Sequence, residues 1–572
     1  MPNLLTRWGR DFDRHNPLPE YPRPQFMRDG WINLNGIWDY AIYKQDKPLA
    51  GWQPGKCQGE ITVPYSPEAQ LSGVGHRLLP DETLCYRREF LLEELTPVTL
   101  LHFGAVDHAC TAWVNQKEAG SHIGGFTPFS FDISALVQQG QNEIYIEVTD
   151  PSDTSYISRG KQSSKPGGIW YSSQSGIWQT VWLEQLPQRY LASVRMEPDI
   201  DRATINVTPS DDCVAILQDE RHALKAGVIN KIPVKDMRLW SPENPHLYDI
   251  HFECGDDRIQ SYFGMRKFSL GKDAQGISRL FLNNEPYFHN GLLDQGYWPD
   301  GLLTPPSDEA LLHDIREMKR LGFNMLRKHI KIELLRWYYH CDREGMLVWQ
   351  DMVNGGRGGQ RLGINGALPF IGARVKDGPR NYRRFGRENA DGRAQYYAEL
   401  DCMVSCLQNC VSLAMWVPFN EGWGQFDANK ATHFILERDK SRLIDEASGW
   451  HDQGGGDCLS SHIYFRPLKA AKRKRGDERA FVMSEFGGYS YAIKHHVWKE
   501  GKVFGYKKFD SPQALQAAFA TLYEKQLLPL IPQGLSAAVY TQVSDIEDEV
   551  NGLLTYDREI CKVEPMEGIK LE

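Results

Sequence analysis

The hydrophobic and polar positions follow a β rhythm over the first third of the chain. Up to about residue 187, short segments with alternating or β-branched apolar residues are separated by Gly, Asn, Asp and Pro, which is typical of strands joined by turns. No helical spacing of useful length interrupts them. We therefore predict a two-sheet, jelly-roll-like β-sandwich over residues 1–187. Its predicted strands include 99–103, 111–115, 143–148 and, as the last, 176–184.

A second and smaller β segment follows over residues 188–270. Strand-like stretches lie at 203–207, 213–217 and 248–252, and the turn-rich stretch 240–245 precedes the last of them. A segment of about eighty residues with this pattern suits an immunoglobulin-like β-sandwich.

Strand and helix alternate from residue 271 to the end. Residues 308–321 have helical apolar spacing with Ser307 as a candidate cap, and residues 322–327 follow as a strand. This alternation over about 300 residues predicts a (β/α)8 TIM barrel at 271–572. The Gly-rich stretch 354–372 predicts an active-site loop. Further predicted elements are a helix at 334–343 and strands at 346–350, 413–419, 458–464, 481–485 and 535–541.

Composition narrows the class of protein. The chain has 572 residues, with 41% hydrophobic and 24% charged residues, which is ordinary for globular domains. A net charge of −9 argues against a nucleic-acid binder, which usually carries a basic face. The 16 Trp and 25 Tyr suit carbohydrate binding, because sugar faces stack on aromatic rings, although most such rings serve packing.

The N-terminal segment has no apolar signal sequence, and no run of eighteen apolar residues exists, so we expect no membrane partner. The 11 cysteines lack metal-ligand spacing, including the helical series Cys402, Cys406 and Cys410. We therefore expect a cytoplasmic protein with reduced thiols.

Two glutamates each follow a short apolar run. Glu421 comes after 415–420, and Glu485 comes after 481–484. Carboxylates at the C-terminal ends of barrel strands are where such enzymes keep their chemistry. A pair roughly 5–5.5 Å apart can cleave a glycosidic bond with retention, whereas about 9 Å indicates inversion. Either dipeptide alone would usually be structural, so a non-catalytic carbohydrate-binding protein is the alternative from another class.

Four further motifs occur in order along nearly the whole chain, at residues 34–38, 86–90, 239–248 and 263–267. With the two glutamate motifs, the chain resembles glycoside hydrolase family 2, which includes β-galactosidases, β-glucuronidases and β-mannosidases. The resemblance implies a sugar-binding sandwich, an immunoglobulin-like domain and a catalytic barrel.

The resemblance also implies roles for single residues. Asn420-Glu421 matches the acid/base motif, Glu485 the nucleophile, and Tyr464 a tyrosine that hydrogen-bonds the nucleophile. Asp351 aligns with a carboxylate that binds magnesium in some members; we expect no required cofactor, with a divalent cation left open. Further candidates for substrate binding are His329, Asp294, Trp416, His462 and Tyr540, with packing as the alternative for Trp416.

The sugar is left open between two classes. By family frequency we expect a β-galactosidase acting on a small carbohydrate or glycoside, and the chain could form a homo-oligomer. The alternative is a β-glucuronidase or β-galacturonidase, although the Asn-x-Lys motif that reads glucuronic acid in β-glucuronidases is not evident, which argues against a glucuronidase. Lys328, Lys331 or Arg357 could still contact an acid by another route.

Overall fold

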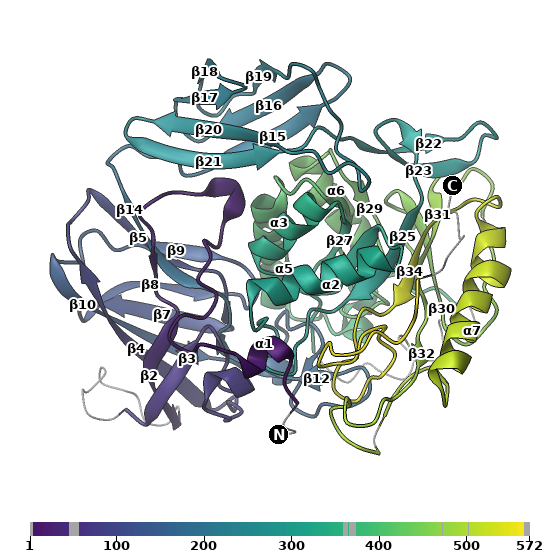
Figure 1. Ribbon diagram of the computed structural model, residues 1–572, viewed down its shortest axis with the longest axis horizontal. Helices are drawn as coiled ribbons and strands as arrows, with labels where there is room; N and C mark the ends of the chain where they lie inside the picture. Colours follow the sequence, from purple (N-terminus) through teal and green to yellow (C-terminus); the bar gives the residue numbers. More distant parts are fainter. Residues whose placement is uncertain are drawn as a thin grey trace.

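The computed structural model describes residues 4–44, 57–357, 364, 373–471, 473–501 and 503–565, and it divides into three β-rich units (Figure 1). The first unit is a sandwich of two antiparallel sheets. The larger sheet has six strands, in the order β3 (Gly59–Val63), β2 (Gly36–Lys44), β4 (Glu82–Leu92), β10 (Gly140–Thr149), β7 (Ala109–Val114) and β8 (Lys117–Ile123). The smaller has four, in the order β1 (Ile32–Asn33), β14 (Val181–Leu186), β5 (Val98–Phe103) and β9 (Phe129–Asp132).

Strand alternation builds the core of this sandwich. On β10, Ile144, Ile146 and Val148 are fully buried and face apolar residues of the smaller sheet such as Leu101 and Leu183. The predicted last strand is in fact two strands, β13 (Gly176–Ile177) and β14. The break occurs because the ring between them, Trp178, packs in the barrel-side core and donates from Nε1 to the carbonyl of Gly125 at 2.7 Å.

The second unit has its own two sheets and its own core, and lies at the top of Figure 1. Its predicted immunoglobulin-like architecture is confirmed. One sheet contains β15 (Val194–Asp199), β16 (Thr204–Pro209) and β19 (Asn230–Pro233). The other contains β18 (Glu220–Leu224), β17 (Cys213–Leu217), β20 (Tyr248–Cys254) and β21 (Asp257–Phe263).

The third unit is a barrel-like sheet of eight parallel strands, as predicted. Their order is β29 (Leu443–Ile444), β28 (Leu413–Val417), β27 (Leu347–Asp351), β26 (Met325–Lys328), β25 (His289–Asp294), β34 (Leu535–Thr541), β31 (Ala480–Gly487) and β30 (Cys458–Ile463). The edge strands β29 and β30 are bridged by Asp457, whose backbone N–H donates to the carbonyl of Ile444 at 2.7 Å. The multidomain fold class is therefore confirmed.

Helices cover the outside of the barrel (Figure 1). Ser307 caps the first of them, since its Oγ accepts from the N–H of Ala310 at 3.1 Å. In the part of the chain that the structure describes, no α-helix joins β29 to β30 or β30 to β31. Within the same residues, no helix is long and apolar enough to cross a membrane. The barrel helices are α2 (Asp308–Arg320), α3 (Leu335–Glu344), α5 (Ala390–Leu407), α6 (Ala428–Arg438) and α7 (Pro512–Leu522).

The N-terminal end of the barrel is filled by a small three-stranded sheet. Its strands are β22 (Phe268–Lys272), β23 (Ser278–Leu282) and β24 (Glu285–Pro286). Leu280 and Leu282 pack there with inward barrel residues such as Val482 and Val539. The opposite, C-terminal end of the barrel carries the two glutamates that the sequence predicts as catalytic. Most of the predicted active-site loop at 354–372 lies outside the described residues.

One buried arginine ties the two sandwiches together. Arg28 is 6% exposed and binds Asp257 of the second unit through Nε and Nη2, both at 2.9 Å. Its Nη1 binds Glu184 of the first unit at 3.0 Å. The guanidinium therefore neutralises carboxylates from both units at once.

We expect Arg28→Met to lower the free energy of unfolding by about 3–5 kcal/mol, because it leaves Asp257 buried without a cation. The matched control is Arg14→Met, since Arg14 pairs with Glu60 at the surface and should contribute less than about 1 kcal/mol. Calorimetric melting of both variants measures the difference. Equal melting temperatures would contradict a stabilising role for this junction.

Candidate active site

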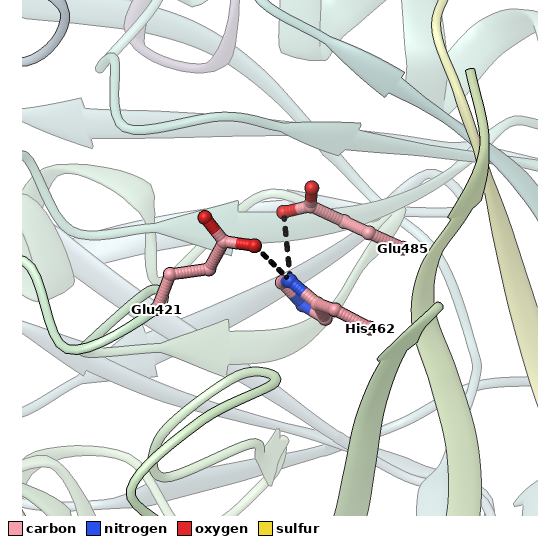
Figure 2. Close-up of side chains that lie close together, drawn as sticks. All are labelled: Glu421, His462 and Glu485. Carbon is pink, nitrogen blue, oxygen red and sulfur yellow. Dashed lines mark hydrogen bonds and ion pairs between the residues drawn. The ribbon is translucent and has the colours of Figure 1, made fainter. Parts of the chain in front are cut away.

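The two predicted catalytic glutamates converge on His462 at the C-terminal end of the barrel (Figure 2). The imidazole Nδ1 lies 2.7 Å from Oε1 of Glu421 and 3.7 Å from Oε1 of Glu485. One oxygen of each carboxylate and this nitrogen all lie within 4.8 Å of one another. All three side chains are well buried. This short separation fits the carboxyl spacing of retaining glycosidases, not the wider spacing of inverting ones.

A strained turn after β28 delivers Glu421. Its φ is 49°, a left-handed conformation that is uncommon for a side chain of this size. The N–H of Glu421 donates to the carbonyl of Ser448 at 2.9 Å, which holds the turn in place. The next residue, Gly422, has φ 71° and a Cβ there would lie 2.6 Å from the His451 ring. Strained backbone held by its surroundings is frequent at functional sites.

An irregularity in β31 delivers Glu485. Ala480 and Val482 face the barrel interior, so simple alternation would send Glu485 outward with Met483. The pairing register of β31 shifts against both neighbouring strands. Against β34 the shift lies between Met483 and Phe486, and against β30 it lies between Ser460 and His462, which pair with Val482 and Glu485. Such bulges re-aim side chains beside active sites. Here the shift turns the carboxylate toward the interior.

Arg327, at the end of β26, connects the site. It is fully buried, and its Nη1 binds Oε1 of Glu485 at 3.2 Å. Its Nη2 donates to Oδ1 of Asn420 at 2.8 Å, and Nε and Nη2 bind the two oxygens of Asp351 at 2.9 and 3.0 Å. His329 also approaches Asp351, with Nδ1 2.7 Å from Oδ2. One guanidinium therefore positions residues from three other strand ends.

The electrostatics separate the two glutamates. Burial raises the pKa of Glu421 above its ordinary value, against the hydrogen bond from His462, and the charge of Glu485 raises it further. Burial also acts on Glu485, but His462 and Arg327 outweigh it and hold the pKa of Glu485 below its ordinary value. Environments that push two carboxyl pKa values apart assign one as the acid and the other as the anion.

Tyr464 contacts the predicted nucleophile as the resemblance implied. Its hydroxyl donates to Oε2 of Glu485. Burial, followed by the charge of Glu485, raises the pKa of this phenol well above its ordinary value, so it stays a donor. The ring stacks on Tyr506, with centroids 4.1 Å apart and planes at 9°. The stack fixes the direction of the hydroxyl.

Asn420 combines one fixed and one free group. Its Oδ1 is held by Arg327, while its buried Nδ2 has no acceptor among the described residues. A buried donor without a partner is costly unless a ligand supplies one. Nδ2 is therefore available to a bound molecule beside Glu421.

Three predicted site residues lie away from the carboxylate pair. Trp416 packs between strand and helices and donates from Nε1 to Asp439 at 2.9 Å. Tyr540 also faces the helix layer, and its hydroxyl accepts from the N–H of Tyr489 at 3.1 Å. Both follow from alternation, since Met415, Val417 and Val539 fill the interior instead. Asp294, at the end of β25, is bound to Lys328 at 2.8 Å.

Three residues were not selected from the sequence as parts of the site. The sequence predicts only that Arg327 ends the strand at 322–327, and it gives no role to Tyr506 or Lys161. A strand-ending arginine beside a lysine and a histidine was a usable signal for Arg327. No local signal pointed to Lys161, which comes from the first sandwich.

A cation could in principle use the cluster of Glu421, His462 and Glu485, whose ligand atoms lie close together. Glu485 is already bound by Arg327 and Tyr464, and Nδ1 of His462 lies between the two carboxylates. Both oxygens of Asp351, the aligned magnesium ligand, are taken by Arg327. These contacts fit an acid/base pair better than a metal centre.

Comparisons with known proteins identify the two sandwiches. Residues 78–187 match the family model "Glycosyl hydrolases family 2, sugar binding domain", and residues 190–266 match "Glycosyl hydrolases family 2". A beta-galactosidase of Photobacterium profundum is 25% identical over 396 residues, which are 58% of this chain and 37% of that protein. The match therefore spans less than half the length of this curated relative.

Solved structures match nearly the whole chain. A GH2 beta-galacturonidase of Eisenbergiella tayi bound to galacturonate has a TM-score of 0.67 at 18% identity, covering 96% of this chain and 97% of that one. A beta-glucuronidase of an uncultured Clostridium has a TM-score of 0.70 at 16% identity, again covering 96% and 97%. At these identities the likeness concerns the fold. Both family models match in order along the chain, so residues 78–266 carry the two sandwich domains described for glycosyl hydrolases family 2.

Proposed function

We propose that this protein is a retaining exo-β-glycosidase that removes terminal sugars by double displacement. The observation that carries the proposal is the separation of at most 4.8 Å between one oxygen of Glu421 and one of Glu485. A nucleophile so close to the acid leaves no room for an inverting water. The exo action follows from the family resemblance.

In the first step, Glu421 protonates the glycosidic oxygen while Glu485 attacks the anomeric carbon. The bond to the leaving group breaks and a glycosyl-Glu485 ester forms. In the second step, Glu421 removes a proton from water, which attacks the same carbon and releases Glu485. Arg327 and Tyr464 hold the nucleophile, and Nδ2 of Asn420 donates to the sugar 2-hydroxyl.

The sugar has two candidates. A β-galactoside is favoured by relatives such as the beta-galactosidase of Photobacterium profundum. A β-uronide is favoured by one observation in the site: Lys161 is buried and has no charged partner among the described residues. Turnover of uronides alone in a panel of nitrophenyl glycosides would exclude a galactosidase.

Glu485→Gln should abolish turnover of every nitrophenyl glycoside that the wild type hydrolyses, because no nucleophile remains. Glu421→Gln should lower kcat/KM by about 10²–10⁴-fold for leaving groups that need protonation. The exposed Glu118→Gln serves as the control and should leave the rate unchanged. Proton NMR of the first product should detect the β anomer; an α anomer would contradict retention.

Asn420→Ala should lower kcat/KM by about 100-fold, since contacts with the 2-hydroxyl supply several kcal/mol in the transition state. A 2-deoxy substrate provides the check. It should be slow with the wild type, and Asn420→Ala should slow it little further. If the loss from the Asn420→Ala change and the loss from removing the 2-hydroxyl multiply instead, Asn420 does not contact the 2-hydroxyl.

The pH profile should be bell-shaped, rising as Glu485 loses its proton and falling as Glu421 loses its own. His462 lowers the pKa of both glutamates. His462→Phe should therefore move both limbs of kcat/KM to higher pH, while the exposed His433→Phe should move neither. Limbs that stay in place would show that His462 has only a packing role.

A further inference from the structure

A segment of the first sandwich reaches the mouth of the barrel. The N–H groups of Arg159 and Gly160 both donate to the carbonyl of Asn354 at 3.0 Å, and Arg159 Nη1 binds the carbonyl of Gly356 at 2.7 Å. Further along, the N–H of Ser172 binds Glu547 at 2.9 Å. These contacts fix residues 158–172 against the loops that follow the barrel strands.

This segment buries a lysine beside the catalytic pair. Lys161 is only 6% exposed, and its Nζ lies 5.6 Å from the ring centroids of both Tyr171 and Trp423. Trp423 is two residues beyond Glu421, and its ring centroid is 6.5 Å from that of His329. The ammonium therefore lies between aromatic walls at the edge of the site.

Lys161 differs from the other described buried lysines in having no anionic partner. Lys328 is bound to Asp294 at 2.8 Å, Lys331 to Glu333 at 2.6 Å, and Lys562 to Asp545 at 2.6 Å. Among the described residues, none accepts a hydrogen bond from Nζ of Lys161 or pairs with it. An unpaired buried charge is costly, and two ring faces compensate for only part of the lost hydration.

The charge of Lys161 affects the pKa values of two residues in the site. After burial, it is the largest influence that lowers the pKa of His329, and it also lowers the pKa of Glu421. Lys328 and Lys331, the lysines first considered for reading an acid, are occupied by Asp294 and Glu333. Of these three lysines, Lys161 is therefore the one whose ammonium group is free to pair with an anion that enters the site.

We propose that Lys161 binds the carboxylate of the sugar that is removed, so that the first sandwich supplies the residue that selects a uronide. This inference rests on the proposed glycosidase function. The ammonium would pair with the carboxylate that replaces the 6-hydroxymethyl group of a neutral hexose, and the rings of Tyr171 and Trp423 would flank that contact.

The test compares matched substrates that differ only in this group. They are the nitrophenyl β-galacturonide against the β-galactoside, and the β-glucuronide against the β-glucoside. The wild type should prefer the acidic member of at least one pair. Lys161→Met should lower kcat/KM for that uronide by about 10- to 100-fold and leave the neutral sugar within a few-fold. Lys165→Met, an exposed lysine on the same segment, is the control and should change neither.

Equal losses on both members of a pair would overturn the proposal, because they would indicate a general effect on the catalytic glutamates. A wild-type preference for the neutral sugars would overturn it as well. Melting temperatures of the two methionine variants separate these results from unfolding.

If the wild type hydrolyses none of the four glycosides, both sugars proposed for the enzyme are wrong, and calorimetric binding of free galacturonate and glucuronate still decides the role of Lys161. Binding of a uronate that weakens in Lys161→Met but not in Lys165→Met would support it. Equal binding of the acids and of the neutral sugars by wild type and Lys161→Met would overturn it.

Discussion

The site depends on one buried guanidinium. Arg327 is fully removed from water, and this is tolerable because its N–H groups meet two carboxylates, the amide oxygen of Asn420 and the carbonyl of Ser484. Without it, Asp351 and Glu485 would be buried anions close to one another. The planar fork of an arginine, and not the single charge of a lysine, can hold partners from several strand ends at fixed angles.

The chemistry and the stability of this protein use charges in different ways. At the junction of the sandwiches, Arg28 lies between two carboxylates that hold separate units together. In the barrel, burial and then the charge of Glu485 raise the pKa of Glu421, whereas His462 and Arg327 lower the pKa of Glu485, so the two neighbouring glutamates differ in their affinity for a proton. The packed strands keep the pair from separating to relieve the repulsion.

The sequence was sufficient for the architecture and for placing the two glutamates at strand ends, because both depend on local patterns. The cap at Ser307, the strand at 535–541 and the motif Asn420-Glu421 are read within a few residues. Long-range placement was not accessible. Trp416 and Tyr540 were selected from their neighbours, yet they lie on the outward faces of their strands, while Glu485 reaches the interior only through an irregular register. Lys161 lies far from the barrel motifs along the chain, so only the packing of the units brings it to the site.

The backbone contacts that hold residues 158–172 against the barrel have a consequence for divergence among homologues. The contacts of Arg159 and Gly160 with Asn354 run from backbone to backbone, so they do not depend on which side chains are present. In this pair of backbone contacts only the glycine is constrained, since its φ is 65° and a Cβ would lie 3.0 Å from the carbonyl of Ile330. The segment can therefore change at other positions, Lys161 included, while these backbone contacts keep its path. Lineages could acquire new substrate preferences by drift in this stretch, with the carboxylate machinery left unchanged.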